Sequence, residues 1–322
     1  MISGRASLCV PELEMRLGSP GTPGLALPKA PQGLGSLNSA RINRFPPFGT
    51  LRERPMTNKP ARALNRAGMS VLVFDDSGAA SRAATQSIVS SLRNALAARN
   101  RAVLGLATGA TPEKVYTNLV GLHRAGELSF LNVATYNLDE YYPIQPLDPK
   151  SYRSYMHRHL FSHVDLPANQ AHFLDGTVPE SGVAEHAAQF DQWIEADGGL
   201  DLQLLGIGRN GHIGFNEPGE LPVAESLQLP TRLIDLHPIT RADAAREFGG
   251  VERVIPRALT MGVATILAAR SIVILATGPH KADAVAKALS GPMTAEVPAS
   301  LLQAAAPRVT WMLDESAAAG LS

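Results

Sequence analysis

The chain has 322 residues, and its 29 lysines and arginines are balanced by 29 aspartates and glutamates. A hydrophobic fraction of 45% with 18% charged residues is ordinary for a folded domain, and zero net charge gives no electrostatic reason to expect nucleic acid or a membrane surface as partner. The single cysteine, Cys9, excludes an internal disulfide and a cysteine-based zinc site. The longest apolar run, residues 258–269, is too short to span a bilayer. We therefore expect a cytoplasmic protein.

The first 68 residues differ in composition from the rest of the chain. They hold 10 lysines and arginines against 3 acidic residues, together with 9 prolines, and they show no helical or strand period. Such a segment buries too little apolar surface to offset its ordering entropy. It is either an arginine-rich targeting leader, or a disordered tail or upstream sequence, since Met56 and Met69 both precede the ordered pattern. We predict a leader-like or disordered extension over residues 1–69 and one α/β domain over residues 70–322.

From residue 70 onward, short apolar runs rich in β-branched residues alternate with stretches of helical period. This alternation is typical of a parallel sheet whose strands are connected by helices. It predicts a doubly wound, Rossmann-like α/β fold, with one mostly parallel sheet and helices on both faces. The predicted strands are residues 71–74, 103–107, 133–136, 202–207, 272–276 and 309–313. The predicted helices include one that buries Ile88 and Leu92, one that opens at Pro112, and three more at residues 151–160, 183–194 and 281–289.

Small residues follow the second predicted strand. The run Thr108, Gly109, Ala110, Thr111 leads into a helix whose first residue is Pro112. Ligands of doubly wound sheets bind beyond the carboxyl ends of the strands. A small-residue turn that enters a helix offers free backbone N–H groups and the positive end of the helix dipole, which suits a phosphate group. The alternative is a plain tight turn that Thr111 caps.

Two adjacent carboxylates follow the third predicted strand. Asp139 and Glu140 come directly after Asn137 and Leu138. A carboxylate at a strand end could act as the general base that removes a carbon-bound proton. Adjacent acids are also common as solvated loop charges, so the pattern alone leaves both interpretations open.

A glycine-rich segment follows the strand at residues 202–207. It contains a formal GxGxxG motif from Gly206 to Gly211, but further glycines and a proline interrupt the next turn, so no helix follows as dinucleotide binding requires. The segment also places His212 between Asn210 and Glu217. An amide and a carboxylate can orient an imidazole and tune it as a proton shuttle. A structural or solvated loop histidine is the alternative.

A lysine stands at the start of the helix that follows the strand at residues 272–276. Because a cation there opposes the helix dipole, Lys281 needs an anionic partner, and a phosphate would serve. The stretch at residues 240–248 contains arginines that could supply a second cation. A surface ion pair with a neighbouring acid is the alternative role for such an arginine.

Five segments of the chain carry motifs in a fixed order: LATGATP at 106–112, NLDEY at 137–141, GIGRNGHIGFNEP at 206–218, RALTMGV at 257–263 and GPHKA at 278–282. In this order and spacing they resemble the signatures of the glucosamine-6-phosphate deaminase family. The resemblance covers roughly residues 70–316. The related 6-phosphogluconolactonases share the fold and the phosphate loop, but their third motif typically reads DGHTASLFPG, so the FNEP string favours the deaminase.

The resemblance implies conversion of glucosamine 6-phosphate and water to fructose 6-phosphate and ammonia, with neither metal nor redox cofactor. By position, His212 opens the sugar ring with support from Asn210 and Glu217, and Asp139 moves a proton from C2 to C1. An aspartate stands at the position of Asn210 in the best-studied members. The residues that match the phosphate site are Thr108, Gly109, Ala110, Thr111, Arg246 and Lys281.

Two other functions stay open at this stage. A lactonase would hydrolyse 6-phosphogluconolactone from the same phosphate site without removing a C2 proton. A non-catalytic sugar-phosphate sensor would keep the phosphate site and lose the acid–base groups, whereas Asp139, His212 and Glu217 are all present. A homo-oligomer also stays open.

Overall fold

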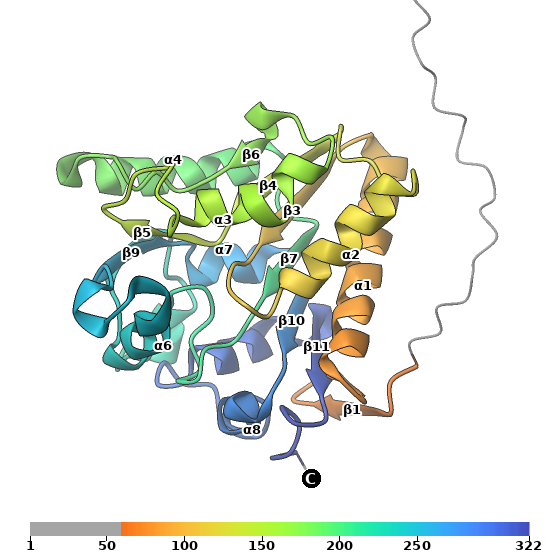
Figure 1. The fold of residues 1–322 in the computed structure, drawn as a ribbon. Helices are drawn as coiled ribbons and strands as arrows, with labels where there is room; N and C mark the ends of the chain where they lie inside the picture. The colour runs from red at the N-terminus through yellow and green to blue at the C-terminus, as the bar shows by residue number, and fades with distance from the viewer. Residues whose placement is uncertain (1–58, 322) are drawn as a thin grey trace, which may run out of the picture. The chain divides into compact units, whose positions relative to one another are not determined.

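The computed structural model of the chain describes residues 59–321 and centres on one eight-stranded sheet (Figure 1). Only the edge pair, formed by the first two strands of the sheet, is antiparallel; the others pair in parallel. The predicted doubly wound α/β fold is therefore confirmed. In spatial order the strands are β1 (Arg62–Arg66), β2 (Met69–Phe74), β11 (Val309–Asp314), β10 (Ile272–Ala276), β7 (Leu202–Leu205), β3 (Ala102–Leu106), β4 (Val133–Asn137) and β6 (Ala171–His172).

All six predicted strands are present, each within two residues of its expected ends. The described fold begins earlier than the expected boundary at residue 70, because β1 forms a ladder with β2 and Leu64 packs on the core. A five-residue edge strand with alternating burial gives too weak a pattern to recognise inside an arginine-rich segment. The rest of the expected extension, with Cys9, lies outside the described residues.

Helices cover both faces of the sheet, as Figure 1 shows. One face packs against α1 (Ser77–Arg99), α2 (Glu113–Arg124) and α3 (Tyr152–His159). The other packs against α4 (Val183–Ala196), α7 (Val263–Ala268), α8 (Ala282–Ser290) and the 3-10 segment Pro298–Arg308. The sequence of α1 shows why this helix forms. At its start the Asp76 side chain accepts a hydrogen bond from the N–H of Ala79. Ile88 and Leu92, four residues apart, lie on its buried face. No helix in the described range is long and apolar enough to cross a membrane.

A second, antiparallel sheet was not predicted. It consists of β5 (Asp139–Tyr142), β9 (Arg257–Thr260) and β8 (Arg232–Asp235). The long apolar run at residues 258–269 divides at Gly262 into β9 and α7. Helices α5 (Val223–Ser226) and α6 (Pro238–Phe248) flank this sheet in the chain, and an apolar cluster that includes Phe215, Phe248 and Ala258 packs beneath it.

The strand order places a topological switch point between β3 and β7. From β3 the chain proceeds outward through β4 and β6, whereas from β7 it proceeds the opposite way through β10 and β11. Where the order reverses, the loops that leave the two strands separate and open a crevice at their carboxyl ends. The loop after β3 begins at Ala107, and the loop after β7 begins at Gly206. Two of the four predicted polar clusters therefore flank this crevice, with those after β4 and β10 beside them.

Candidate active site

Asp139 begins β5 and is buried, with 6% of its surface exposed. It stands opposite Thr260 of β9 in the antiparallel ladder. Burial raises the pKa of Asp139 well above its usual range, and the neighbouring charge of Glu140 adds to the effect. A carboxyl group with such a pKa holds its proton more strongly than an exposed aspartate does. It is therefore suited to accept a proton from carbon.

Glu140 has a different role from its neighbour. Its carboxylate accepts hydrogen bonds from the backbone N–H groups of Tyr152 (2.9 Å) and Arg153 (3.1 Å), in the first turn of α3. Burial raises its pKa, but these hydrogen bonds oppose the effect. Because successive side chains of a strand point to opposite sides, the two acids separate. Neither is a solvated loop charge, so that alternative is excluded.

Replacing Asp139 with Asn is expected to raise the midpoint of thermal unfolding at neutral pH. The increase should be about 2–4 °C for each kcal/mol by which the free energy of unfolding rises. Since the pKa of Asp139 is raised on folding, its contribution to stability is complete below the unfolded pKa and is lost as pH rises through the folded one. Asn escapes this loss because it does not ionise. Thermal melts of both proteins should differ most near neutral pH and converge toward about pH 4. A variant that is less stable at every pH would show that burial is not what perturbs this carboxyl.

The loop after β7 lies directly against Asp139. A Cβ placed on Gly214 would stand 3.5 Å from Asp139 Oδ2 and 3.1 Å from Thr260 Oγ1, so the backbone approaches both side chains closely. The N–H of Phe215 donates to Thr260 Oγ1 at 3.0 Å. Gly214 has φ +55°, which favours glycine. The loop that carries His212 therefore packs against the predicted base two residues further along, at Gly214.

His212 lies against the backbone of Gly208, where an added Cβ would come within 2.3 Å of the imidazole ring. Its Nδ1 is 3.4 Å from Glu217 Oε2 and 3.2 Å from Thr240 Oγ1. No hydrogen bond engages Nε2 in the described part of the chain. The ring is thus held by one nitrogen, and the other stays available to a substrate. The alternative of a solvated loop histidine is excluded, because only 17% of the side chain is exposed.

Within the described residues, Asn210 makes no hydrogen bond to the imidazole ring itself. Its Nδ2 donates to Glu217 Oε2 at 2.9 Å, and its Oδ1 accepts from the backbone N–H of His212 at 3.3 Å. The amide therefore positions the carboxylate and the loop. Burial raises the pKa of Glu217, but hydrogen bonds and charge at His212, with hydrogen bonds from Thr240 and Asn210, bring it below its usual range. Glu217 is consequently ionised at neutral pH.

The loop after β3 has the features of an anion site. Gly109 has φ +104°, and the turn runs through Ala110 and Thr111 into Pro112, which precedes α2 as its N-cap rather than its first residue. In the part of the chain that the structure describes, the backbone N–H groups from Thr108 to Thr111 make no hydrogen bond. Free N–H groups beside a helix N-terminus bind phosphate well.

Two cations of the predicted phosphate site lie on other elements. Lys281 precedes α8, after β10, and burial lowers its pKa while Asp243 raises it. Asp243 itself forms an ion pair with Arg209, at 2.7 Å. Arg246 is exposed in the last turn of α6. Among residues 59–321 no hydrogen bond or ion pair joins Lys281 or Arg246 to the loop after β3, so their roles stay predictions.

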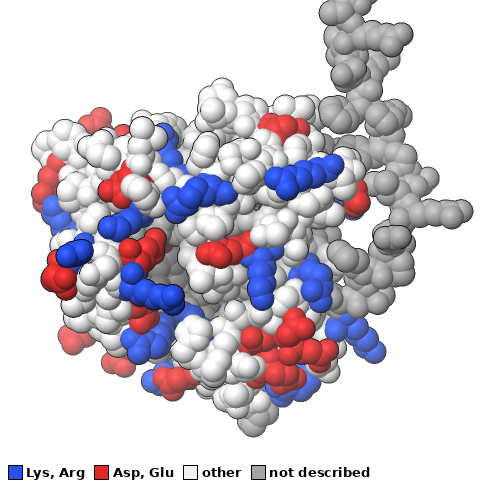
Figure 2. All heavy atoms as spheres, viewed as in Figure 1, with Lys and Arg blue, Asp and Glu red and all other residues white. Residues whose placement is uncertain are grey.

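Charges of both signs are mixed on the face seen in Figure 2. No group of three potential metal-ligating side chains occurs within residues 59–321.

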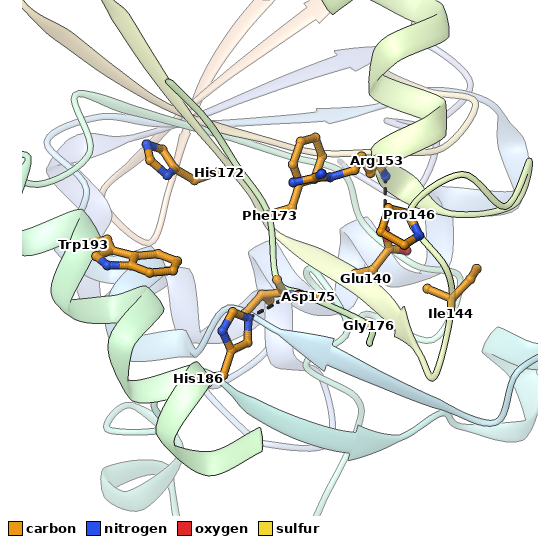
Figure 3. A pocket seen from close by; sticks show the side chains of 11 residues that line it. Glu140, Ile144, Pro146, Arg153, His172, Phe173, Asp175, Gly176, His186 and Trp193 are labelled. Carbon is orange, nitrogen blue, oxygen red and sulfur yellow. Dashed lines mark hydrogen bonds between the residues drawn. The ribbon is translucent and has the colours of Figure 1, made fainter. Parts of the chain in front are cut away.

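A cavity of about 340 Å³ lies beside Glu140, lined by Arg153 of α3 and by His186 and Trp193 of α4 (Figure 3). Its lining contains none of the residues around His212.

Sequence reasoning missed three residues that shape this site. Thr240 contacts His212 from the first turns of α6, Thr260 fixes the loop beside Asp139, and Gly208 gives the imidazole room. Only Gly208 carried a usable signal, since it stands among closely spaced glycines. The threonines come from elements far away in the chain. Thr260 lies inside the motif at 257–263 and Thr240 begins the stretch at 240–248, but neither pattern indicates a contact with this loop.

A buried acid lies against the loop that carries an imidazole–carboxylate pair, next to the switch point of an α/β sheet, and such groups are typical of enzymes that transfer protons. Residues 75–311 match the family of glucosamine-6-phosphate isomerases and 6-phosphogluconolactonases. The chain belongs to that family, and the resemblance inferred from its motifs is confirmed.

The chain is similar to several bacterial proteins. It is 49% identical over 216 residues to the glucosamine-6-phosphate deaminase of Rhodopirellula baltica. These residues cover 67% of this chain and 83% of that protein. It is 47% identical over 220 residues to the glucosamine-6-phosphate deaminase of Bacillus velezensis, which is 68% of this chain and 88% of that one.

The chain is also similar to solved structures. The structure of a monomeric glucosamine-6-phosphate deaminase matches with a TM-score of 0.72 and 38% identity, covering 78% of this chain and 99% of that one. The 6-phosphogluconolactonase of Trypanosoma brucei matches with a TM-score of 0.64 but only 18% identity, covering 81% of this chain and all of that one (100%). The second likeness shows a shared fold alone.

Proposed function

We propose that this protein is a glucosamine-6-phosphate deaminase, which converts glucosamine 6-phosphate and water to fructose 6-phosphate and ammonia. The observation that carries the proposal is that the loop holding the His212–Glu217 pair lies against the buried Asp139 at Gly214. Deamination at C2 needs both a base for a carbon-bound proton and a separate group that opens the ring. The relatives named above support the same substrate.

Ring opening falls to His212. With its proton on Nδ1 and directed at the Glu217 carboxylate, the neutral imidazole has its Nε2 lone pair free. Nε2 takes the proton of the C1 hydroxyl and returns a proton to the ring oxygen, as the C1 carbonyl forms and the C1–O5 bond breaks. Glu217 stabilises the transient imidazolium because it is ionised and adjacent.

The later steps fall to Asp139. Its carboxylate removes the C2 proton of the open-chain sugar, and the electron pair forms the C1=C2 bond and leaves O1 as an enolate oxygen. O1 takes a proton from the neighbouring C2 ammonium group, which gives a neutral 1,2-enolamine. The same carboxyl returns its proton to C1, which leaves an iminium group at C2. Water then adds to C2 and ammonia departs, giving the ketone of fructose 6-phosphate. These are proton transfers and an addition of water, so the sequence of steps calls for neither a metal nor a redox cofactor.

The phosphate group would bind at the loop after β3. The free N–H groups from Thr108 to Thr111 supply the donors, and Lys281 and Arg246 the positive charge. The phosphate does not react. Its binding energy holds C1 and C2 against Asp139 and His212.

The function is tested by incubating the purified full-length protein with glucosamine 6-phosphate. Ammonia and fructose 6-phosphate should appear in equal amounts, without added metal or redox cofactor. Isomerised sugar without ammonia, or no product, would refute the proposal. A non-catalytic sugar-phosphate sensor would bind the sugar and release nothing.

Glu217→Gln is expected to lower kcat by about 10–10²-fold, because an amide keeps the shape but cannot stabilise an imidazolium. Steady-state kinetics on glucosamine 6-phosphate measure the change. Glu220→Gln, at an exposed position three residues further along, is the control and should leave kcat unchanged. If both variants matched the unmodified protein, the assignment of His212 and Glu217 would be wrong.

A further inference from the structure

Two tyrosines that the mechanism does not use hold the loop after β3. The hydroxyl of Tyr155, from α3, donates to the carbonyl oxygen of Gly109 at 2.7 Å. The hydroxyl of Tyr116, from α2, donates to the carbonyl oxygen of Ala107. Both side chains are buried, with 8% of Tyr155 and none of Tyr116 exposed, and their rings meet edge to face. The two hydroxyls therefore hydrogen-bond to the backbone carbonyls of the residues on either side of Thr108.

These hydrogen bonds set the direction of two N–H groups. A trans peptide is planar, so its C=O and N–H point in opposite directions. When the Gly109 carbonyl is directed at Tyr155, the N–H of Ala110 is directed away from α3. By the same geometry, the Ala107 carbonyl on Tyr116 directs the N–H of Thr108 away from α2. Both N–H groups are among those that make no hydrogen bond within the described residues.

The Gly109–Ala110 peptide is the one that needs such a restraint. Gly109 has φ +104°, and a Cβ placed on it would meet nothing within 4 Å, so sterics do not hold this peptide. If it rotated, a carbonyl oxygen would replace the Ala110 N–H in the crevice and repel an anion. Burial raises the pKa of the Tyr155 hydroxyl, which keeps it protonated as a donor must be.

Tyr155 is itself positioned by the segment that carries Asp139, the proposed base. Glu140 accepts from the first N–H groups of α3, and Asp139 precedes it directly in β5. The register of β5 therefore determines both where the base lies and where the Tyr155 hydroxyl meets the loop.

We propose that Tyr155, with Tyr116, is a positioning residue that holds the Thr108–Thr111 loop with its N–H groups toward the substrate phosphate. The inference rests on the proposed function for its substrate, but the loop's affinity for phosphate can be measured without any turnover. Tyr155 acts on the phosphate through the Gly109 peptide and has no part in the proton transfers.

The test is Tyr155→Phe, which removes the hydroxyl and keeps the ring. KM for glucosamine 6-phosphate should rise about 3–10-fold while kcat stays within about twofold, the range for one lost hydrogen bond that acts on binding. The dissociation constant of inorganic phosphate, measured by calorimetry, should rise by the same factor. Tyr116→Phe should show the same pattern.

Tyr142→Phe is the matched control. Its hydroxyl also donates to a backbone carbonyl, that of Val178 at 2.8 Å, and its side chain is equally buried, but it does not touch the loop. This variant should leave KM and phosphate affinity unchanged. Unchanged phosphate affinity in Tyr155→Phe, an equal loss in Tyr142→Phe, or a fall in kcat at constant KM would each overturn the proposal. Weakened phosphate binding in a protein that releases no ammonia would uphold this inference and refute the proposed function.

Discussion

Asp139→Asn is expected to reduce kcat for glucosamine 6-phosphate by about 10²–10⁴-fold, the usual contribution of a general base. Asn has the same shape, but its amide cannot accept the C2 proton. KM should change little, because the proposed phosphate site lies in a different loop. Asp235→Asn is the control, since Asp235 is exposed at the end of β8 in the same small sheet and has no proposed role. Near-normal turnover in Asp139→Asn would remove Asp139 from the mechanism.

The same residue sets the acid limb of the pH profile. Asp139 must be ionised to act as a base, and its pKa is raised by burial and by Glu140. The rate should therefore increase with pH as Asp139 loses its proton. The pKa read from the acid limb of the kcat/KM profile should lie above the pKa range of an exposed aspartate. A limb at the ordinary position would show that substrate-free Asp139 is not perturbed.

Removing the phosphate from the substrate should lower kcat/KM by about 10³-fold or more. Each hydrogen bond to a charged group is worth about 1.5–3 kcal/mol, and the loop from Thr108 to Thr111 offers several. Lys281→Ala should act on the same interaction, with KM raised about 10-fold or more and kcat changed less. The measurement is kcat/KM for glucosamine and for its 6-phosphate with both proteins.

Arg270→Ala is the control for Lys281→Ala. Arg270 pairs with Asp201 just before the amino ends of β10 and β7, whereas the proposed site lies at their carboxyl ends. Equal activity on glucosamine and glucosamine 6-phosphate would refute the phosphate assignment, whatever Lys281→Ala shows.

The main sheet could be predicted because its central strands are continuous apolar runs, buried on both faces. The run at residues 272–276 coincides with β10 and is fully buried. The rule that ligands bind at the carboxyl ends of such strands then located four polar clusters, and the strand order places two of them at the switch point.

The small sheet could not be predicted from its sequence. Strand β5 begins with two acids, and its partner β9 lies more than a hundred residues further along the chain, so no local pattern indicates the ladder. Yet this ladder buries Asp139 and separates it from Glu140. Side-chain contacts could not be predicted from spacing either. The spacing places Asn210 near His212, but only the folded loop shows that its amide donates to Glu217.

The central claim is that this crevice removes a C2 proton from an amino sugar rather than hydrolysing a lactone. The most direct measurement is kcat/KM of the full-length protein for glucosamine 6-phosphate and for 6-phosphogluconolactone, repeated with Asp139→Asn. The account predicts that the amino sugar is strongly preferred and that its turnover is lost in the variant. Faster hydrolysis of the lactone, unaffected by Asp139→Asn, would contradict it.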